Sequence, residues 1–211
     1  MTSISDSLPP KAEFAFGESP FRAKGSLYLG TQKFFKKKVP GGLEALVEAI
    51  GPGPLADFIG QLFMPAFWYD ALLAPKLIAH EAKVMNLSLE DYLVERTTWQ
   101  VEQDSGGIYK FLLKLTSPRF VADRLPIMMS QMFDFCDLDV ERIAEAERVA
   151  HFRGIPVPLE SWLRVSLKLY TEIILKLAGA KSVDVHFLPS EPMEAKAGVA
   201  RLHLTYRVIW T

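Results

Sequence analysis

The sequence predicts an α+β domain, in which a helical N-terminal half precedes an antiparallel sheet of about three strands packed by one long helix. Three observations lead to this prediction. Apolar residues recur at helical spacing through much of the first half of the chain. Residues 199–210 and residues 182–188 each alternate apolar and polar side chains, which is typical of strands with one buried face. We expect these two segments to pair across the loop of residues 189–198.

Composition and charge set the class of protein. The chain has 211 residues, of which 49% are hydrophobic, and we expect residues 1–20 to form a flexible leader and residues 21–211 a single domain. A formal net charge of -1 speaks against nucleic-acid binding. Cys136 is the single cysteine, which excludes an internal disulfide and favours a reducing, cytoplasmic location. Charged residues and prolines interrupt the most apolar window, residues 58–79, so we expect no transmembrane segment.

Glycine, proline and capping residues divide the first half into helices. They delimit a short helix within residues 39–54, and a second short helix follows in residues 55–63. Leucines and alanines keep helical spacing over residues 68–85. The string SLED is a capping box that opens a helix in residues 89–103. A Ser-Pro pair places an N-cap and a first helical position at the start of a helix in residues 117–135.

The second half contains one ambiguous segment. Residues 139–156 have the propensity of a helix, yet their alanines and Phe152 also fall on one face of a strand. We interpret residues 142–153 as a strand, and a helix stays the alternative. Residues 159–178 are clearer, because their apolar side chains share one helical face, which we expect to cover the sheet.

Several strings resemble a paralogous family of small myxobacterial proteins of unknown function. They are KGSLYLGTQKFF near the start, SPRFVADRLP in the middle, LAGAKSVDVHF after the long helix and a final YRVIW. The SPR of this chain stands where the family pattern begins with glycine. The resemblance implies a fold and no activity.

The order of helices and sheet more distantly resembles the heme nitric-oxide-binding domain. The Tyr-x-Ser-x-Arg motif of that family, which binds the heme propionates, aligns with Leu115, Ser117 and Arg119, so the tyrosine is missing. The proximal histidine of the family lies on a helix upstream, and His80 is the candidate here. The resemblance implies heme as a cofactor, whereas the residues by themselves lead us to expect none.

Three histidines form a candidate metal site. If residues 142–153 form a strand, then His151, His186 and His203 all take the polar phase of neighbouring strands. Three imidazoles on one face could ligate zinc and leave a position open. The alternative is a solvated sheet face whose opposite charges pair across strands.

A candidate apolar ligand pocket rests on methionines and aromatic residues. Flexible, polarizable side chains of this kind line adaptable binding sites, although at helical spacing they also build ordinary cores. The candidate residues are Met64, Phe67, Trp68, Trp99, Met128, Met129, Met132 and Phe133.

No motif of a known catalytic class stands out, and a lone cysteine without a positioned base is typically structural. We therefore expect a non-enzymatic regulatory or sensory domain that binds a small apolar ligand or a protein partner. Two alternatives stay open. One is a metal- or heme-binding protein that uses the histidines. The other is a structural interaction module, self-associating or not, that makes contact through the edge of residues 199–210 or the basic run of residues 33–38.

Overall fold

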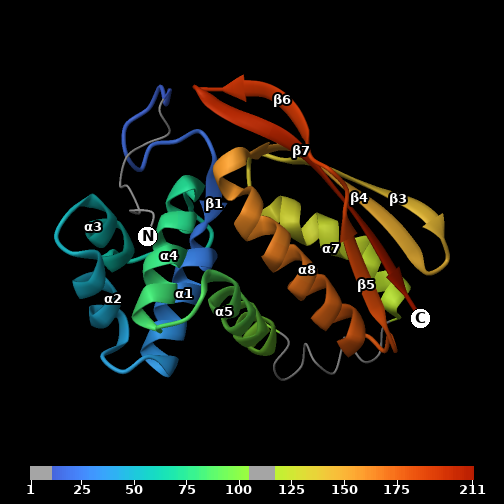
Figure 1. Ribbon diagram of the computed structural model, residues 1–211, viewed down its shortest axis with the longest axis horizontal. Coiled ribbons are helices and arrows are strands. Elements are labelled where there is room, and N and C mark those ends of the chain that lie inside the picture. Colours follow the sequence, from blue (N-terminus) through green and yellow to red (C-terminus); the bar gives the residue numbers. More distant parts are fainter. Residues whose placement is uncertain (1–10, 105–116) are drawn as a thin grey trace.

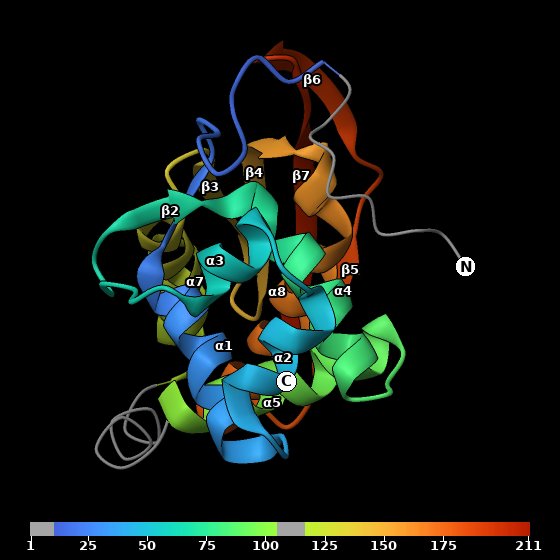
Figure 2. The same ribbon diagram turned by 90° about the vertical axis from the view of Figure 1, so that its left-hand side faces the viewer.

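The computed structural model describes residues 11–104 and 117–211 and shows an α+β fold in layers. Helices of the N-terminal half gather on one side, and the sheet lies on the other (Figure 1). Helices α7 and α8 cover one face of the sheet, and α8 also packs against α5. From the helical side, α1 to α4 lie in front of α8 and the sheet (Figure 2). The elements of this half are β1 (Arg22–Lys24), α1 (Gly25–Lys38), α2 (Gly42–Ile50), α3 (Pro54–Gly60), β2 (Trp68–Asp70), η1 (Ala71–Leu73), α4 (Ala74–Val84) and α5 (Leu89–Asp104).

The predicted capping residues begin two helices. Ser88 Oγ accepts a hydrogen bond from the Asp91 amide at 3.1 Å at the start of α5. Ser117 Oγ accepts one from the Phe120 amide at 3.3 Å at the start of α7 (Pro118–Met132). These helix starts, and the short helices α2 and α3 between glycines, are confirmed.

The predicted helix over residues 68–85 is wrong in its first part. Trp68–Asp70 is strand β2, which pairs antiparallel with β1. Asp70 caps the helical turn that follows, because its Oδ1 accepts a hydrogen bond from the Leu72 amide at 2.8 Å and one from the Ser19 hydroxyl at 2.5 Å. Helix therefore begins after Asp70, and the aromatic residues before it take the extended form that suits them. Ser19, which we expected in a flexible leader, is buried in this contact.

Five strands form the main sheet, where the sequence predicted about three. They are β3 (Asp137–Ala144), β4 (Glu147–Pro156), β5 (Val183–Phe187), β6 (Glu191–Lys196) and β7 (Val199–Trp210), in the order β3-β4-β7-β5, with β6 also pairing β7. The strand interpretation of residues 142–153 is confirmed, but a turn divides the segment into β3 and β4. Pairing of β5 with β7 is confirmed, and the expected loop between them contains β6.

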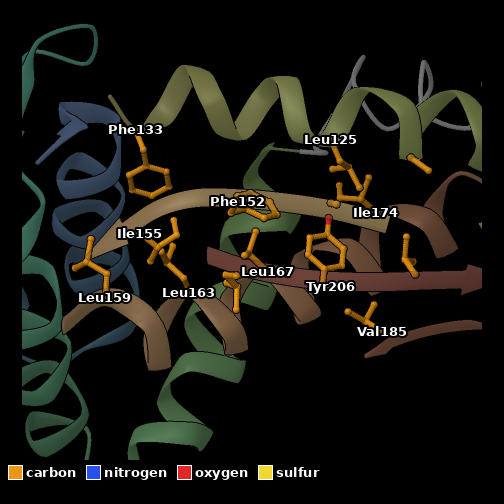
Figure 3. Close-up of a cluster of buried hydrophobic side chains, with 14 of the residues drawn as sticks. Leu125, Phe133, Phe152, Ile155, Leu159, Leu163, Leu167, Ile174, Val185 and Tyr206 are labelled. Carbon is orange, nitrogen blue, oxygen red and sulfur yellow. The ribbon is translucent and has the colours of Figure 1, made fainter. Parts of the chain in front are cut away.

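Two hydrophobic clusters meet inside the molecule. One lies between the sheet and its covering helices, where Phe152 and Tyr206 face Leu163 and Leu167 of α8 (Glu160–Leu177) (Figure 3). The other fills the space between α1, α4 and α5. Trp162 packs against both clusters and so joins the helical half to the sheet. Among the described residues, no helix is both long and apolar enough to span a membrane.

Candidate functional site

The loop between α3 and β2, together with the first residue of β2, exposes large apolar side chains. The exposed fractions are 81% for Leu62, 48% for Met64, 62% for Phe67 and 37% for Trp68. Single exposed apolar residues are common on protein surfaces, but four within seven residues of chain are not. We call residues 62–68 the apolar loop.

The apolar loop is fixed from inside by one buried residue. Phe63 is 2% exposed, stacks on Tyr28 with ring centroids 5.0 Å apart, and meets Tyr69 edge-on at 4.8 Å. The hydroxyl of Tyr69 also accepts a hydrogen bond from the Met64 amide at 3.0 Å. Burial of Phe63 therefore orients its neighbours outward.

The backbone of the apolar loop is joined to the start of α1. The Gly25 amide donates to the Phe67 carbonyl at 2.8 Å, and the Ser26 amide donates to the Pro65 carbonyl at 3.1 Å. These amides belong to the first turn of α1, which has no partners for them within the helix. A Cβ at Gly25 would lie 2.2 Å from the Met64 carbonyl oxygen, so this approach requires glycine.

Lys24 contacts the C-terminal part of the apolar loop. Its Nζ donates to the Ala66 carbonyl at 2.8 Å and lies 3.6 Å from the centroid of the Trp68 ring. The exposed apolar side chains thus stand on a backbone that is held at several points.

The residues predicted to line a pocket do not gather around one cavity. Met64, Phe67 and Trp68 lie on the surface, whereas Trp99 is buried in the helical cluster and Phe133 in the sheet cluster. Met132 is partly buried, with its Sδ 3.7 Å from Ser26 Oγ, and the side chains of Met128 and Met129 lie outside the described part. In the part of the chain that the structure describes, one surface hollow lies along α4 and the start of α5 and another lies between α2 and α3, and none of the predicted residues lines either hollow.

Two of the three predicted metal ligands are in contact. His151 Nδ1 lies 3.2 Å from His203 Nε2. Both histidines alternate along their strands with the buried residues Phe152 and Leu204, so they lie on the face of the sheet opposite the buried cluster. His186 stands apart on β5, in register with Arg207, and its Nε2 lies 2.6 Å from Asp184 Oδ2. No group of three histidine, cysteine or acidic side chains in the described ranges is placed to hold a metal ion together.

Of the three residues aligned with heme-binding positions, His80 lies apart from the other two. His80 is on α4, which packs against η2 (Val157–Leu159) directly after β4. Ser117 caps α7, and Arg119 is in the first turn of α7, one turn before Asp123, which contacts the hairpin at the start of β4. A strand of ten residues spans about 30 Å, so the two groups lie near opposite ends of β4. Leu115 falls outside the described residues.

The interior between α1, α4 and α5 holds a carboxyl group that the sequence did not single out. Glu81 is 1% exposed and accepts a hydrogen bond from the Tyr92 hydroxyl. Burial raises the pKa of Glu81, and hydrogen bonds from Tyr92 and Thr31 and the charge of Arg96 oppose this effect. The signal was present in the helical pattern, since Glu81 falls on the same face of α4 as Leu77 and Ile78.

The basic run of residues 33–38 ends α1. Phe34 and Phe35 are buried in the helical cluster, while Lys36, Lys37 and Lys38 form the last turn, where cations complement the helix dipole. Lys37 Nζ also donates to Gln103 Oε1 at 3.3 Å. The position of this run at the C-terminus of α1 accounts for its lysines.

Solved structures match the fold of this chain. An Fe(II) unliganded H-NOX protein from K. algicida has a TM-score of 0.56 at 12% identity, with 89% of this chain and 96% of that chain covered. A mutant of the T. tengcongensis H-NOX protein has a TM-score of 0.56 at 10% identity, with 89% and 97% covered. A protein studied for the modulation of heme redox potential through porphyrin distortion has a TM-score of 0.57 at 12% identity, with 89% and 95% covered.

The expected likeness to heme nitric-oxide-binding domains is thus confirmed for the fold, and at such identities the likeness shows the fold alone. No protein-family model and no curated protein matches the sequence. The resemblance to the myxobacterial family stays a prediction.

Proposed function

We propose that this chain is a non-catalytic regulatory domain that binds a protein partner through the apolar loop. The observation that carries the proposal is the exposure of Leu62, Met64, Phe67 and Trp68 on a backbone held in place by α1. Burying one such side chain contributes about 1.5–3 kcal/mol, so two or three are enough to anchor an interface. Because the backbone is already fixed, little ordering free energy opposes binding.

The same side chains favour a partner over a small apolar ligand. A ligand site is concave and surrounds most of its ligand, whereas these residues project from a loop beside β2. A sensory task is supported by analogy of fold with the H-NOX proteins.

Heme is the cofactor that the resemblance implies, and its fit depends on the side chains of the helical half. The candidate axial ligand His80 lies on α4, apart from Ser117 and Arg119 at the start of α7. The buried tyrosine of α5, Tyr92, already donates its hydroxyl hydrogen to Glu81. Edge-on contacts of Phe34 with Tyr92 and Trp99, at centroid distances of 6.1 and 5.3 Å, fill the space between α1 and α5. These residues do not fit a heme, and we expect no Soret band when hemin is titrated into the purified protein.

A photo-crosslinking amino acid at Leu62 tests the proposal in the source cells, with Ile143 as the matched control. Ile143 is 53% exposed and lies on β3 in the other half of the molecule. A partner should cross-link from Leu62 and not from Ile143. The purified partner should then bind about thirtyfold more weakly to Phe67→Ser, the loss typical of a hot spot, and unchanged to Ile143→Ser. Equal cross-linking from both positions, or equal affinity of both variants, would refute the proposal.

A further inference from the structure

Two histidines meet on the open face of the sheet, away from the apolar loop. His151 of β4 is in register with Thr205 of β7, and His203 precedes Thr205 by two residues on the same face. The side chains of His151 and His203 are 17% and 18% exposed, and Thr205 is buried. This cluster is therefore partly shielded from water.

Three polar atoms of the cluster form a nearly equilateral triangle. His151 Nδ1 is 3.2 Å from His203 Nε2 and 3.3 Å from Thr205 Oγ1, and His203 Nε2 is 3.1 Å from Thr205 Oγ1. Ligands bound tetrahedrally at about 2.0–2.1 Å from one ion lie about 3.3 Å from each other. The spacing of the three atoms is that of three ligands around one metal ion.

A carboxylate faces the far nitrogen of each ring. His151 Nε2 lies 3.4 Å from Glu141 Oε1, and His203 Nδ1 lies 3.4 Å from Glu191 Oε2. The hydrogen bond with Glu191 favours the tautomer of His203 that carries its hydrogen on Nδ1, as carboxylates do for metal-bound histidines, whereas His151 Nε2 is close to Glu141 without a hydrogen bond to it.

With that tautomer, His203 Nε2 has a lone pair that faces His151 Nδ1, and a hydrogen on Nε2 of His151 gives its Nδ1 a lone pair as well. The Thr205 hydroxyl has a single hydrogen and can satisfy only one of them. A cation between the two nitrogens satisfies both.

We propose that His151 Nδ1 and His203 Nε2 bind one divalent transition-metal ion of the zinc type, with the Thr205 hydroxyl beside it and water at the open position. Two imidazoles and oxygen suit zinc and its neighbours in the periodic table. Glu141 and Glu191 supply negative charge on two sides. The proposal is independent of the apolar loop and goes beyond the proposed function.

Both acidic and basic side chains surround the cluster of His151, His203 and Thr205. Arg153 of β4 is in register with His203, and Asp139 of β3 with His151. Arg207 follows Thr205 on the same face, and its Nε is 2.7 Å from Glu147 Oε1, so its charge is paired within the sheet. Arg201 lies two residues before His203 on the same face, and its Nε donates to the Glu194 carbonyl at 2.8 Å. In the described part, the three nearby carboxylates of Asp139, Glu141 and Glu191 therefore outnumber Arg153 and Arg201, the two nearby cations without an ion-paired acid.

Calorimetric titration of zinc chloride into chelator-treated full-length protein tests the site. We expect one zinc per chain, and a loss of affinity of at least about tenfold in both His151→Ala and His203→Ala. The matched control is His186→Ala, which removes a histidine from β5 on the same face and should leave zinc affinity unchanged. Glu191→Gln changes a 77% exposed side chain and should weaken zinc binding by about 10–100-fold without a change of fold.

Nuclear magnetic resonance of the imidazole rings provides a second readout. Zinc should shift Nδ1 of His151 and Nε2 of His203, and leave both nitrogens of His186 in place. Absence of zinc binding in the native protein, equal loss in His186→Ala, or native affinity in a folded His203→Ala variant would each overturn the proposal.

Discussion

Replacement of Arg148 by alanine should be among the most damaging single changes in the sheet. Arg148 is 1% exposed, and its Nε donates to Asp123 Oδ1 at 2.7 Å. Its Nη1 donates to the carbonyls of Ala144 and Glu147 at 2.7 and 2.8 Å, and its guanidinium lies 5.2 Å from the Trp210 ring. One side chain thus ties α7, the β3–β4 turn and the end of β7 together.

The expected loss follows from these partners. Removing one member of a buried ion pair costs about 3–5 kcal/mol, and each buried carbonyl left without a donor costs about 1–3 kcal/mol. Asp123 is 21% exposed and the turn reaches water, so solvent recovers part of this loss. We expect Arg148→Ala to lower the free energy of unfolding by about 3 kcal/mol, and Tm by about 6–12 °C.

Urea unfolding followed by circular dichroism measures this loss, and Arg142→Ala is the matched control. Arg142 binds the other oxygen of the same carboxylate at 2.6 Å, but its side chain is 60% exposed, so its loss should cost less than about 1 kcal/mol. If Arg148→Ala costs less than about 1 kcal/mol, or no more than Arg142→Ala, the reasoning from burial is refuted.

The stability that the Arg148–Asp123 ion pair contributes should decrease at low pH. Burial by itself would raise the pKa of Asp123, but the hydrogen bond and charge of Arg148, together with Arg142, lower it below its usual value. A lowered folded pKa contributes stability above the unfolded pKa of about 3.9, and this stability is lost as pH falls through the folded value. The difference in free energy of unfolding between native protein and Arg148→Ala should therefore decrease below about pH 4.

Three further predictions test other parts of the structure. Burial, with two neighbouring aspartates, raises the pKa of Cys136 to about 12, so at pH 8 the native thiol should react with a disulfide reagent roughly a thousandfold more slowly than the unfolded chain; rates within tenfold would contradict this. Because burial raises the pKa of Glu81, its stability contribution is complete below the unfolded pKa of about 4.3 and declines as pH rises through the folded value. Relative to native protein, the free energy of unfolding of Glu81→Gln should increase from about pH 4 to 8 in urea titrations. A difference in free energy that stays constant with pH would exclude burial of the Glu81 carboxyl as its cause. Gly154→Ala should cost at least about 1 kcal/mol in thermal unfolding, since φ is +93° and a Cβ would lie 2.8 Å from a backbone oxygen, whereas Gly60→Ala, with nothing within 4 Å, should cost nothing.

The sequence was most informative where one periodicity had no competitor. Strict alternation over residues 199–210 predicts β7, and the apolar face of residues 159–178 predicts α8. Residues 139–156 lack such a signal, because glutamate and alanine favour helix. These residues form strands because β4 pairs with β7, and no local sequence pattern contains that information.

Strand β6 shows how one element creates another. β5 pairs with the last five residues of β7, from Tyr206 to Trp210. The first residues of β7 therefore have a free edge beyond β5, and Glu191–Lys196 folds back along it. The string EPMEAK has little strand propensity of its own, so the sequence predicted a loop.

The apolar loop was found for a reason that the structure corrects. Methionine and aromatic residues singled out Met64, Phe67 and Trp68, but as the lining of a pocket between helices. The direction of these side chains depends on the stacking of Phe63 on Tyr28 and on the hydrogen bond from Ser19 to Asp70. Both contacts join residues that are distant in the sequence, so a local pattern does not reveal them.

Strand register decides which histidines can share an ion. All three candidates take the outward phase of their strands, so a period-two pattern cannot separate them. His186 is in register with Arg207, which lies four residues beyond His203 on β7 and thus about 13 Å along the strand. That distance excludes a common ion, whereas the register of β4 places His151 beside Thr205 and so next to His203. A slip of one residue between β4 and β7 would turn the imidazole of one histidine to the buried face, so the zinc stoichiometry of the native protein also tests the register of the sheet.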